Sequence, residues 1–217
     1  MREILAFTRL DLSAQRGSAR SLAIALLALL IVTAAMRVEP LSLLAACLSL
    51  TLFMPMYFFA MDEAAHLDTL YAALPLRRRE VVLGRHLSVL VLLVTQVALG
   101  LVMVLLVSAV TDGSLPTIGQ LLVVAGLGSG MVLCLVSVTL PVCFALGFAR
   151  SGLWIRIVTL ALVFVGVALL NRVGSPVGTS PGHLSAPMTS VIGLGAGLLA
   201  LALSSAASIA LYGRRDL

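Results

Sequence analysis

Long apolar stretches separated by short polar segments run through the whole of this chain. A helix needs about 20 mostly apolar residues to cross the hydrocarbon core of a membrane. By that criterion the sequence predicts six transmembrane helices, at residues 21–36, 41–61, 87–110, 118–148, 153–170 and 188–211. The fourth stretch is long for a simple crossing and contains Pro141, so we expect a tilt or a kink there.

The longest strongly polar segment, residues 62–86, separates the second predicted span from the third. Its first half carries apolar side chains at positions i, i+3, i+4 and i+7, which is the pattern of an amphipathic helix. These side chains are Leu67, Leu70, Tyr71 and Leu74. Pro75 then ends the helix, and a second helix begins at Arg77, Arg78, Arg79 and Glu80 and continues into the third span. The pattern therefore predicts a helix–break–helix segment, which we call the elbow.

Composition places the chain among integral membrane proteins. Hydrophobic residues make up 61% of its 217 residues and charged residues 11%, and the mean hydropathy is +1.17. Soluble domains are typically about 45–50% apolar and about 25% charged. The fold class that follows is an all-α membrane protein. Residues 1–217 then form a single transmembrane domain, with no room for a second folded domain beside the spans.

The distribution of arginine predicts the orientation. All 14 basic residues are arginine, and the chain has no lysine. With a cytoplasmic N-terminus and six spans, only Arg37 and Arg172 fall outside the cell. Cytoplasmic loops carry the excess of basic residues, so we expect a multi-pass protein of the plasma membrane with both termini and the elbow in the cytoplasm. The net charge of +5 then reflects topology, and nucleic acid is not an expected partner.

The N-terminal segment combines arginines with a neighbouring apolar arc. On a helix, the side chains of Arg2, Arg9, Arg16 and Arg20 fall close to one line. This pattern favours a helix in the inner membrane interface, with arginines reaching lipid phosphates. A partly disordered cationic tail is the alternative.

Several kinds of chemistry are missing. No Asp, Glu, Lys or His falls in the middle of a predicted span, which argues against a proton relay. A Walker A loop needs a lysine to reach the nucleotide phosphates, so ATP and Mg²⁺ would have to bind a partner subunit. Glu63 and His66 have the spacing of two metal ligands on one helix, but a di-iron site needs two such motifs. We assign no catalytic, cofactor-binding or metal-binding residue, and interpret Cys47, Cys134 and Cys143 as packing residues.

Two glycine pairs have the spacing of close helix contacts. Gly126 and Gly130 lie in the fourth predicted span, and Gly193 and Gly197 in the sixth. Glycines four residues apart let two membrane helices approach at their backbones. The contacts could form within one subunit or across a dimer.

The elbow resembles the segment between the second and third spans of small ABC-2-type exporter permeases. The matching residues of the motif, which runs from a Leu-Pro turn to a basic residue opening the next span, are Leu74, Pro75, Arg78, Glu80, Val81, Val82 and Arg85. The chain ends, "ILAFTRLDL" and "ALYGRRDL", are also similar to those of this family. A departure is the short outer loop at residues 171–187, where a large extracellular insert is absent.

The resemblance implies a permease subunit that works with a second permease, identical or homologous, and with two ABC ATPase subunits. It makes the elbow a coupling helix, with Leu67–Leu74, Pro75 and residues 77–80 in contact with the ATPase. The alternative for the elbow is a helix resting in the lipid headgroups.

The predicted spans carry few polar side chains, which suits an amphipathic or apolar substrate such as a peptide, a drug or a lipid-like molecule. Examples are Gln96, Ser108, Ser137, Thr139 and Ser204 within the spans, and Asn171 directly after the fifth. The resemblance implies export. The alternative functions are a secondary carrier or a non-enzymatic scaffold, with an intramembrane enzyme as the weakest candidate.

Overall fold

The computed structural model describes residues 8, 24, 27–28, 30–32, 39–64, 78–110, 115–146 and 185–213. In this part of the chain, four long helices are present: α3 (Leu41–Ala64), α5 (Arg78–Val110), α6 (Ile118–Leu146) and α8 (Ala186–Gly213). Each of them contains a stretch that is long and apolar enough to cross a membrane. These helices correspond to the second, third, fourth and sixth predicted spans. The fifth predicted span, 153–170, lies outside the described residues, as does most of the first, so the total of six remains a prediction.

The third span begins earlier than hydropathy alone predicts. α5 starts at Arg78, so the basic residues of the elbow and the apolar span form one continuous helix, as the restart after Pro75 indicated. Glu80 lies in its first turn, where the helix dipole favours a negative charge. α6 continues through Pro141 to Leu146, so this proline does not end the helix.

Local sequence explains where two helices begin. Pro40 precedes α3, and its fixed backbone angle suits the entry to a helix. At the start of α6, the backbone N–H of Thr117 donates to the Gln120 side chain at 2.9 Å, and the Gln120 N–H donates to the Thr117 hydroxyl at 3.4 Å. This reciprocal capping satisfies backbone donors that the first turn leaves unpaired.

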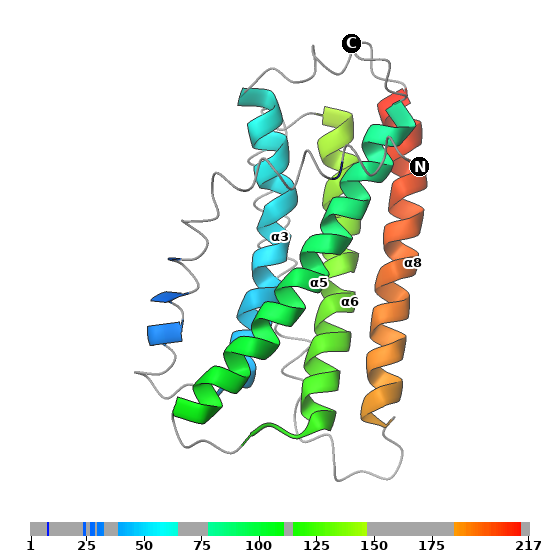
Figure 1. Ribbon diagram of the computed structural model, residues 1–217. Helices are drawn as coiled ribbons and strands as arrows, with labels where there is room; N and C mark the ends of the chain where they lie inside the picture. Colours follow the sequence, from blue (N-terminus) through cyan, green and yellow to red (C-terminus); the bar gives the residue numbers. More distant parts are fainter. Residues whose placement is uncertain are drawn as a thin grey trace.

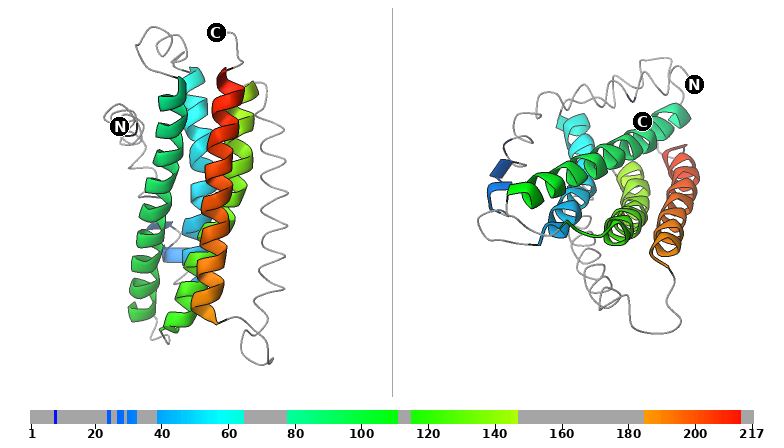
Figure 2. Two further views of the ribbon diagram at one scale, coloured as in Figure 1. Left: turned by 90° about the vertical axis from the view of Figure 1, so that its right-hand side faces the viewer. Right: turned by 60° about the horizontal axis from the view of Figure 1, so that its bottom comes forward.

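The four helices form one bundle, in which α3, α6 and α8 run in the same direction and α5 runs in the opposite one (Figure 1). α6 and α8 lie side by side along their length, whereas α5 crosses the bundle diagonally and packs mainly on α3 (Figures 1 and 2). α3, α6 and α8 end, and α5 begins, at the same end of the bundle. We call this the elbow end, because the elbow connects α3 to α5 there.

The core lies where these helices meet. Its buried apolar side chains come from all four helices and are mainly leucine and valine, as in Leu44 of α3, Val89 of α5, Leu133 of α6 and Leu201 of α8. Many apolar side chains on the opposite faces are exposed, for example Val94, Leu199 and Leu203. An apolar interior with an apolar outer surface is what a bundle surrounded by lipid requires, because lipid tails are the solvent.

Candidate functional site

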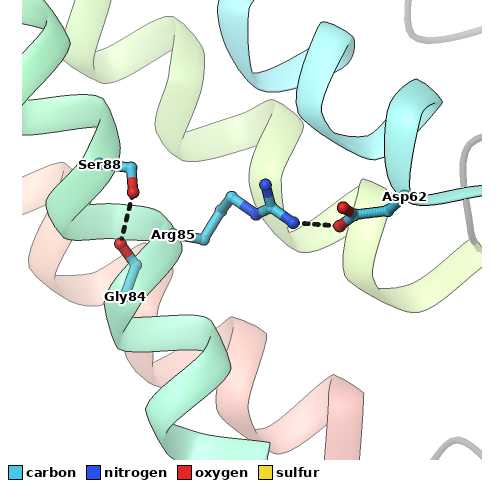
Figure 3. Close-up of polar contacts among 4 residues, drawn as sticks. All are labelled: Asp62, Gly84, Arg85 and Ser88. Carbon is cyan, nitrogen blue, oxygen red and sulfur yellow. Dashed lines mark hydrogen bonds and ion pairs between the residues drawn. The ribbon is translucent and has the colours of Figure 1, made fainter. Parts of the chain in front are cut away.

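A buried ion pair joins α3 to α5 at the elbow end. The guanidinium of Arg85 donates to the carboxylate of Asp62, and Figure 3 shows the arginine reaching from α5 towards the last turn of α3. The Arg85 side chain is only 1% exposed, and that of Asp62 is 15% exposed. A charge so deeply buried is stable only when it is paired, and removing one partner of such a pair is strongly destabilising. The pair therefore fixes the distance between the two ends of the elbow.

Aromatic rings extend this contact to the other helices. The Arg85 guanidinium carbon lies 5.1 Å from the ring centres of both Phe58 and Phe59. Phe59 packs edge-on against Phe144 of α6 at 5.0 Å, and Phe144 packs against Tyr212 of α8 at 5.4 Å. Cation–π contacts and edge-to-face ring pairs both have a preferred geometry, so they orient the groups as well as bury them. We call Arg85, Asp62 and these four aromatic residues the junction, since it links all four helices.

Two hydrogen bonds organise the helix around Arg85. The Ser88 hydroxyl donates to the carbonyl of Gly84 one turn earlier, at 3.0 Å (Figure 3). The Thr8 hydroxyl donates to the same carbonyl at 3.4 Å. A position near the N-terminus of the chain is thus held against the first turns of α5.

His86 makes a second polar link across the bundle. Its ring is buried, with Nδ1 2.8 Å from the carbonyl oxygen of Val82 and Nε2 3.4 Å from the hydroxyl of Ser204 on α8. Both ring nitrogens are occupied by structural partners. Among the described residues, no group of three or more His, Cys, Asp or Glu side chains could hold a metal ion. The surroundings of His86 therefore favour a role in joining α5 to α8.

The four glycines singled out in the sequence lie at one interface within the chain, between α6 and α8. A Cβ atom built on Gly130 would collide with the carbonyl of Gly193, and one built on Gly197 would lie 2.6 Å from the carbonyl oxygen of Gly130. At Gly126 it would lie 2.5 Å from the Cβ of Ser190. The Ser190 hydroxyl lies 2.8 Å from the Leu122 carbonyl oxygen on α6, so the serine can donate a hydrogen bond across the same interface. These two helices touch through their backbones.

Two polar side chains are buried in the middle of α3 and α5, Thr51 and Gln96. Gly100 lies against Cys47, and Arg85 against Asp62, which fixes the antiparallel register of the two helices. Thr51 lies about three turns before Asp62, and Gln96 about three turns after Arg85, so they fall at the same level and on the facing sides. Both are buried, and among the described residues neither the Thr51 hydroxyl nor the Gln96 carbonyl oxygen has a hydrogen-bond partner.

Most of the predicted ATPase contact lies outside the described residues. This holds for Leu67, Leu70, Tyr71, Leu74, Pro75 and Arg77. Arg78 is the first residue of α5, Arg79 is exposed and Glu80 is half-buried. The sequence interpretation placed Asp62 at the start of the elbow and counted Arg85 among the residues that resemble the family motif, but it did not pair them, and it missed the junction. One feature of the sequence could have indicated this pair. The elbow has an acidic residue, Asp62, where it leaves the second predicted span and a basic residue, Arg85, where it enters the third.

Long apolar helices packed in a bundle with an apolar outer surface define an integral membrane protein. A protein-family model described as ABC-2 family transporter protein matches residues 9–213, which is nearly the whole chain. The chain therefore belongs to the ABC-2 family of transporters, and it is a permease; membrane proteins of this family generally work with ABC ATPase partners. No curated protein and no solved structure matches the chain.

Proposed function

We propose that this chain is the permease subunit of an ATP-driven exporter in the plasma membrane, with both termini in the cytoplasm. Two separate ATPase subunits hydrolyse ATP, and a second permease, identical or homologous, completes the pathway. Family membership supports this proposal, together with one feature of the chain itself. It has no lysine, so it cannot supply the Walker A residue that contacts the nucleotide phosphates.

The elbow is the proposed contact with the ATPase. The junction end of the bundle gathers the charged residues Asp62, Arg79 and Arg85, while the opposite ends of α5 and α6 are apolar. The apolar stripe Leu67–Leu74 suits a groove on a folded partner, because an amphipathic helix buries such a stripe on binding. Arg77 and Arg78 add orientation and a smaller, salt-dependent attraction, since exposed ion pairs contribute about 0–1 kcal/mol each.

The substrate class follows from the composition of the bundle interior. Leucine and valine predominate in it, and most of its buried polar side chains are the uncharged hydroxyls of serine and threonine. Such walls suit an amphipathic or apolar molecule, such as a peptide, a drug or a lipid-like compound, because a strongly charged substrate would lack partners during its passage.

Co-purification tests the proposed function. The tagged chain is extracted from native membranes in mild detergent, and bound proteins are identified by mass spectrometry and assayed for ATP hydrolysis. We expect a Walker A protein to co-purify with the wild-type chain and to be lost with the double variant Leu70→Asp, Tyr71→Asp. Each buried side chain contributes about 1.5–3 kcal/mol, so losing both weakens docking by about two to four orders of magnitude.

The matched control introduces a charge at the other end of the bundle. Ser185→Asp lies at the exposed start of α8 and is expected to retain the ATPase. Arg78→Ala is expected to weaken docking only mildly. If the wild-type chain binds no ATPase and instead accumulates substrate in liposomes under an ion gradient, it is a secondary carrier. If the double variant retains wild-type amounts of ATPase, the elbow rests in the headgroups and does not dock.

A further inference from the structure

The ion pair between Asp62 and Arg85 closes the base of the elbow. Asp62 is in the last turn of α3, and Arg85 is two turns into α5, so the two residues stand near the two ends of the elbow in sequence. A bond between these two residues prevents α3 and α5 from separating where the elbow enters the bundle (Figure 3). Any displacement of the elbow therefore reaches both helices together.

The environment of Arg85 argues that the pair has a purpose beyond stability. Its side chain is almost wholly buried, so the charged guanidinium has lost its contact with water, at a cost in free energy. Two apolar side chains of similar size in place of Arg85 and Asp62 would avoid that desolvation cost. The guanidinium is also held in one orientation, by the carboxylate of Asp62 and by contacts with the rings of Phe58 and Phe59. A planar arginine fits such a stacked and hydrogen-bonded site, and a lysine does not.

The junction gives this arginine a route to the remaining helices. Phe59 touches Phe144 of α6, which in turn touches Tyr212 of α8. Val82, one turn before Arg85 on α5, is buried in the same cluster as Phe144 and Tyr212. Closely packed interiors transmit displacement, because their side chains have no free space in which to absorb it.

From this geometry we propose that Arg85 and Asp62 are positioning residues that couple the elbow to the transmembrane helices. The inference rests on the proposed docking of an ATPase on the elbow. When the ATPase moves the elbow, the ion pair carries the displacement into α3 and α5 as one unit, and the aromatic rings carry it to α6 and α8. Without the pair, the elbow moves while the bundle stays in its resting arrangement.

The experiment uses the purified permease–ATPase complex in nanodiscs. Spin labels are placed at two exposed positions away from the junction, Val102 of α5 and Val191 of α8. Their separation is measured by pulsed electron paramagnetic resonance without nucleotide and with ATP and vanadate. We expect the wild-type complex to show a nucleotide-dependent shift. Asp62→Asn should keep its bound ATPase but lose the shift, while Asp62→Glu retains it.

A double variant separates coupling from stability. Asp62→Asn alone removes the carboxylate partner of the buried Arg85 and destabilises the fold, whereas Asp62→Asn with Arg85→Met removes both charges and is expected to recover wild-type thermal stability. If the pair couples the elbow to the bundle, the double variant binds the ATPase and still shows no nucleotide-dependent shift. If the pair is merely structural, stability and shift recover together.

Glu39→Gln is the matched control, because Glu39 is an exposed acidic residue at the opposite end of α3. It is expected to respond to nucleotide as the wild-type complex does. A wild-type complex whose label separation ignores nucleotide, or a double variant with the wild-type shift, overturns the coupling role. A wild-type chain that binds no ATPase overturns the proposed function instead.

Discussion

Replacing Gly130 by alanine should destabilise the bundle far more than replacing Gly119 of α6 or Gly195 of α8. The new Cβ would overlap the carbonyl of Gly193, which is backbone and cannot rotate away. α6 and α8 would have to move apart, losing the close packing on which association of membrane helices depends. Overfilling a packed interior costs about 1–3 kcal/mol, and a backbone obstacle places this substitution at the upper end, about 3 kcal/mol.

This cost can be read as a shift in thermal unfolding. For a chain of this size, 1 kcal/mol corresponds to about 2–4 °C, so Gly130→Ala should lower the midpoint by about 6–12 °C. The assay uses a maleimide dye that becomes fluorescent on reacting with thiols. Cys47 and Cys143 are buried in the folded protein and become accessible when it unfolds. The measurement needs neither substrate nor partner.

Two control variants make the prediction sharp. A Cβ on Gly195 of α8 would meet nothing within 4 Å, and one on Gly119 of α6 would meet only the Cβ of Ala186, at 3.5 Å. Alanine is favoured over glycine inside a helix by up to about 1 kcal/mol, so Gly195→Ala and Gly119→Ala should leave the midpoint unchanged or slightly higher. Equal midpoints for Gly130→Ala and Gly195→Ala would refute the proposed backbone contact.

Three further predictions concern polarity, energy source and topology. Thr51→Val should raise the unfolding midpoint, because it removes a buried hydroxyl without a described partner, whose burial costs about 1–3 kcal/mol. The control Thr95→Val, at an exposed position, should leave the midpoint nearly unchanged. A lower midpoint for Thr51→Val would contradict this account. The isolated chain should hydrolyse no ATP above background, and activity that persists after all partners are removed would show that it contains its own nucleotide site. In intact cells, a membrane-impermeant thiol reagent should label a cysteine at position 179 but not one at position 77, and the reverse pattern would invert the topology.

The sequence predicted the class of fold well, because length and hydropathy constrain membrane helices strongly. α3, α5, α6 and α8 lie where apolar stretches of sufficient length were found, and even the early start of α5 followed from the restart after Pro75. The ends were less predictable. α3 continues to Ala64, past Asp62 and Glu63, because a charge at the end of a span can remain helical when it has a partner.

The junction could not be predicted from one chain. Asp62 and Arg85 are 23 positions apart with Pro75 between them, and nothing local requires them to meet. Phe144 and Tyr212 are apolar residues at the ends of spans, where aromatic residues are common for other reasons. The glycine spacing indicated close contacts, but only the three-dimensional arrangement shows that α6 and α8 are the helices that meet.

The contact between α6 and α8 also has a consequence for biosynthesis. The ribosome makes α6 first and α8 only after the intervening residues 147–185, so the glycine face of α6 enters the lipid before its partner exists. That face offers lipid a shallow groove and little side-chain surface, which holds it weakly. Release of the completed α8 from the translocon therefore closes the bundle. A nascent chain that stops short of Ala186 lacks the partner of this face, so the backbone contact between α6 and α8 can form only late in synthesis.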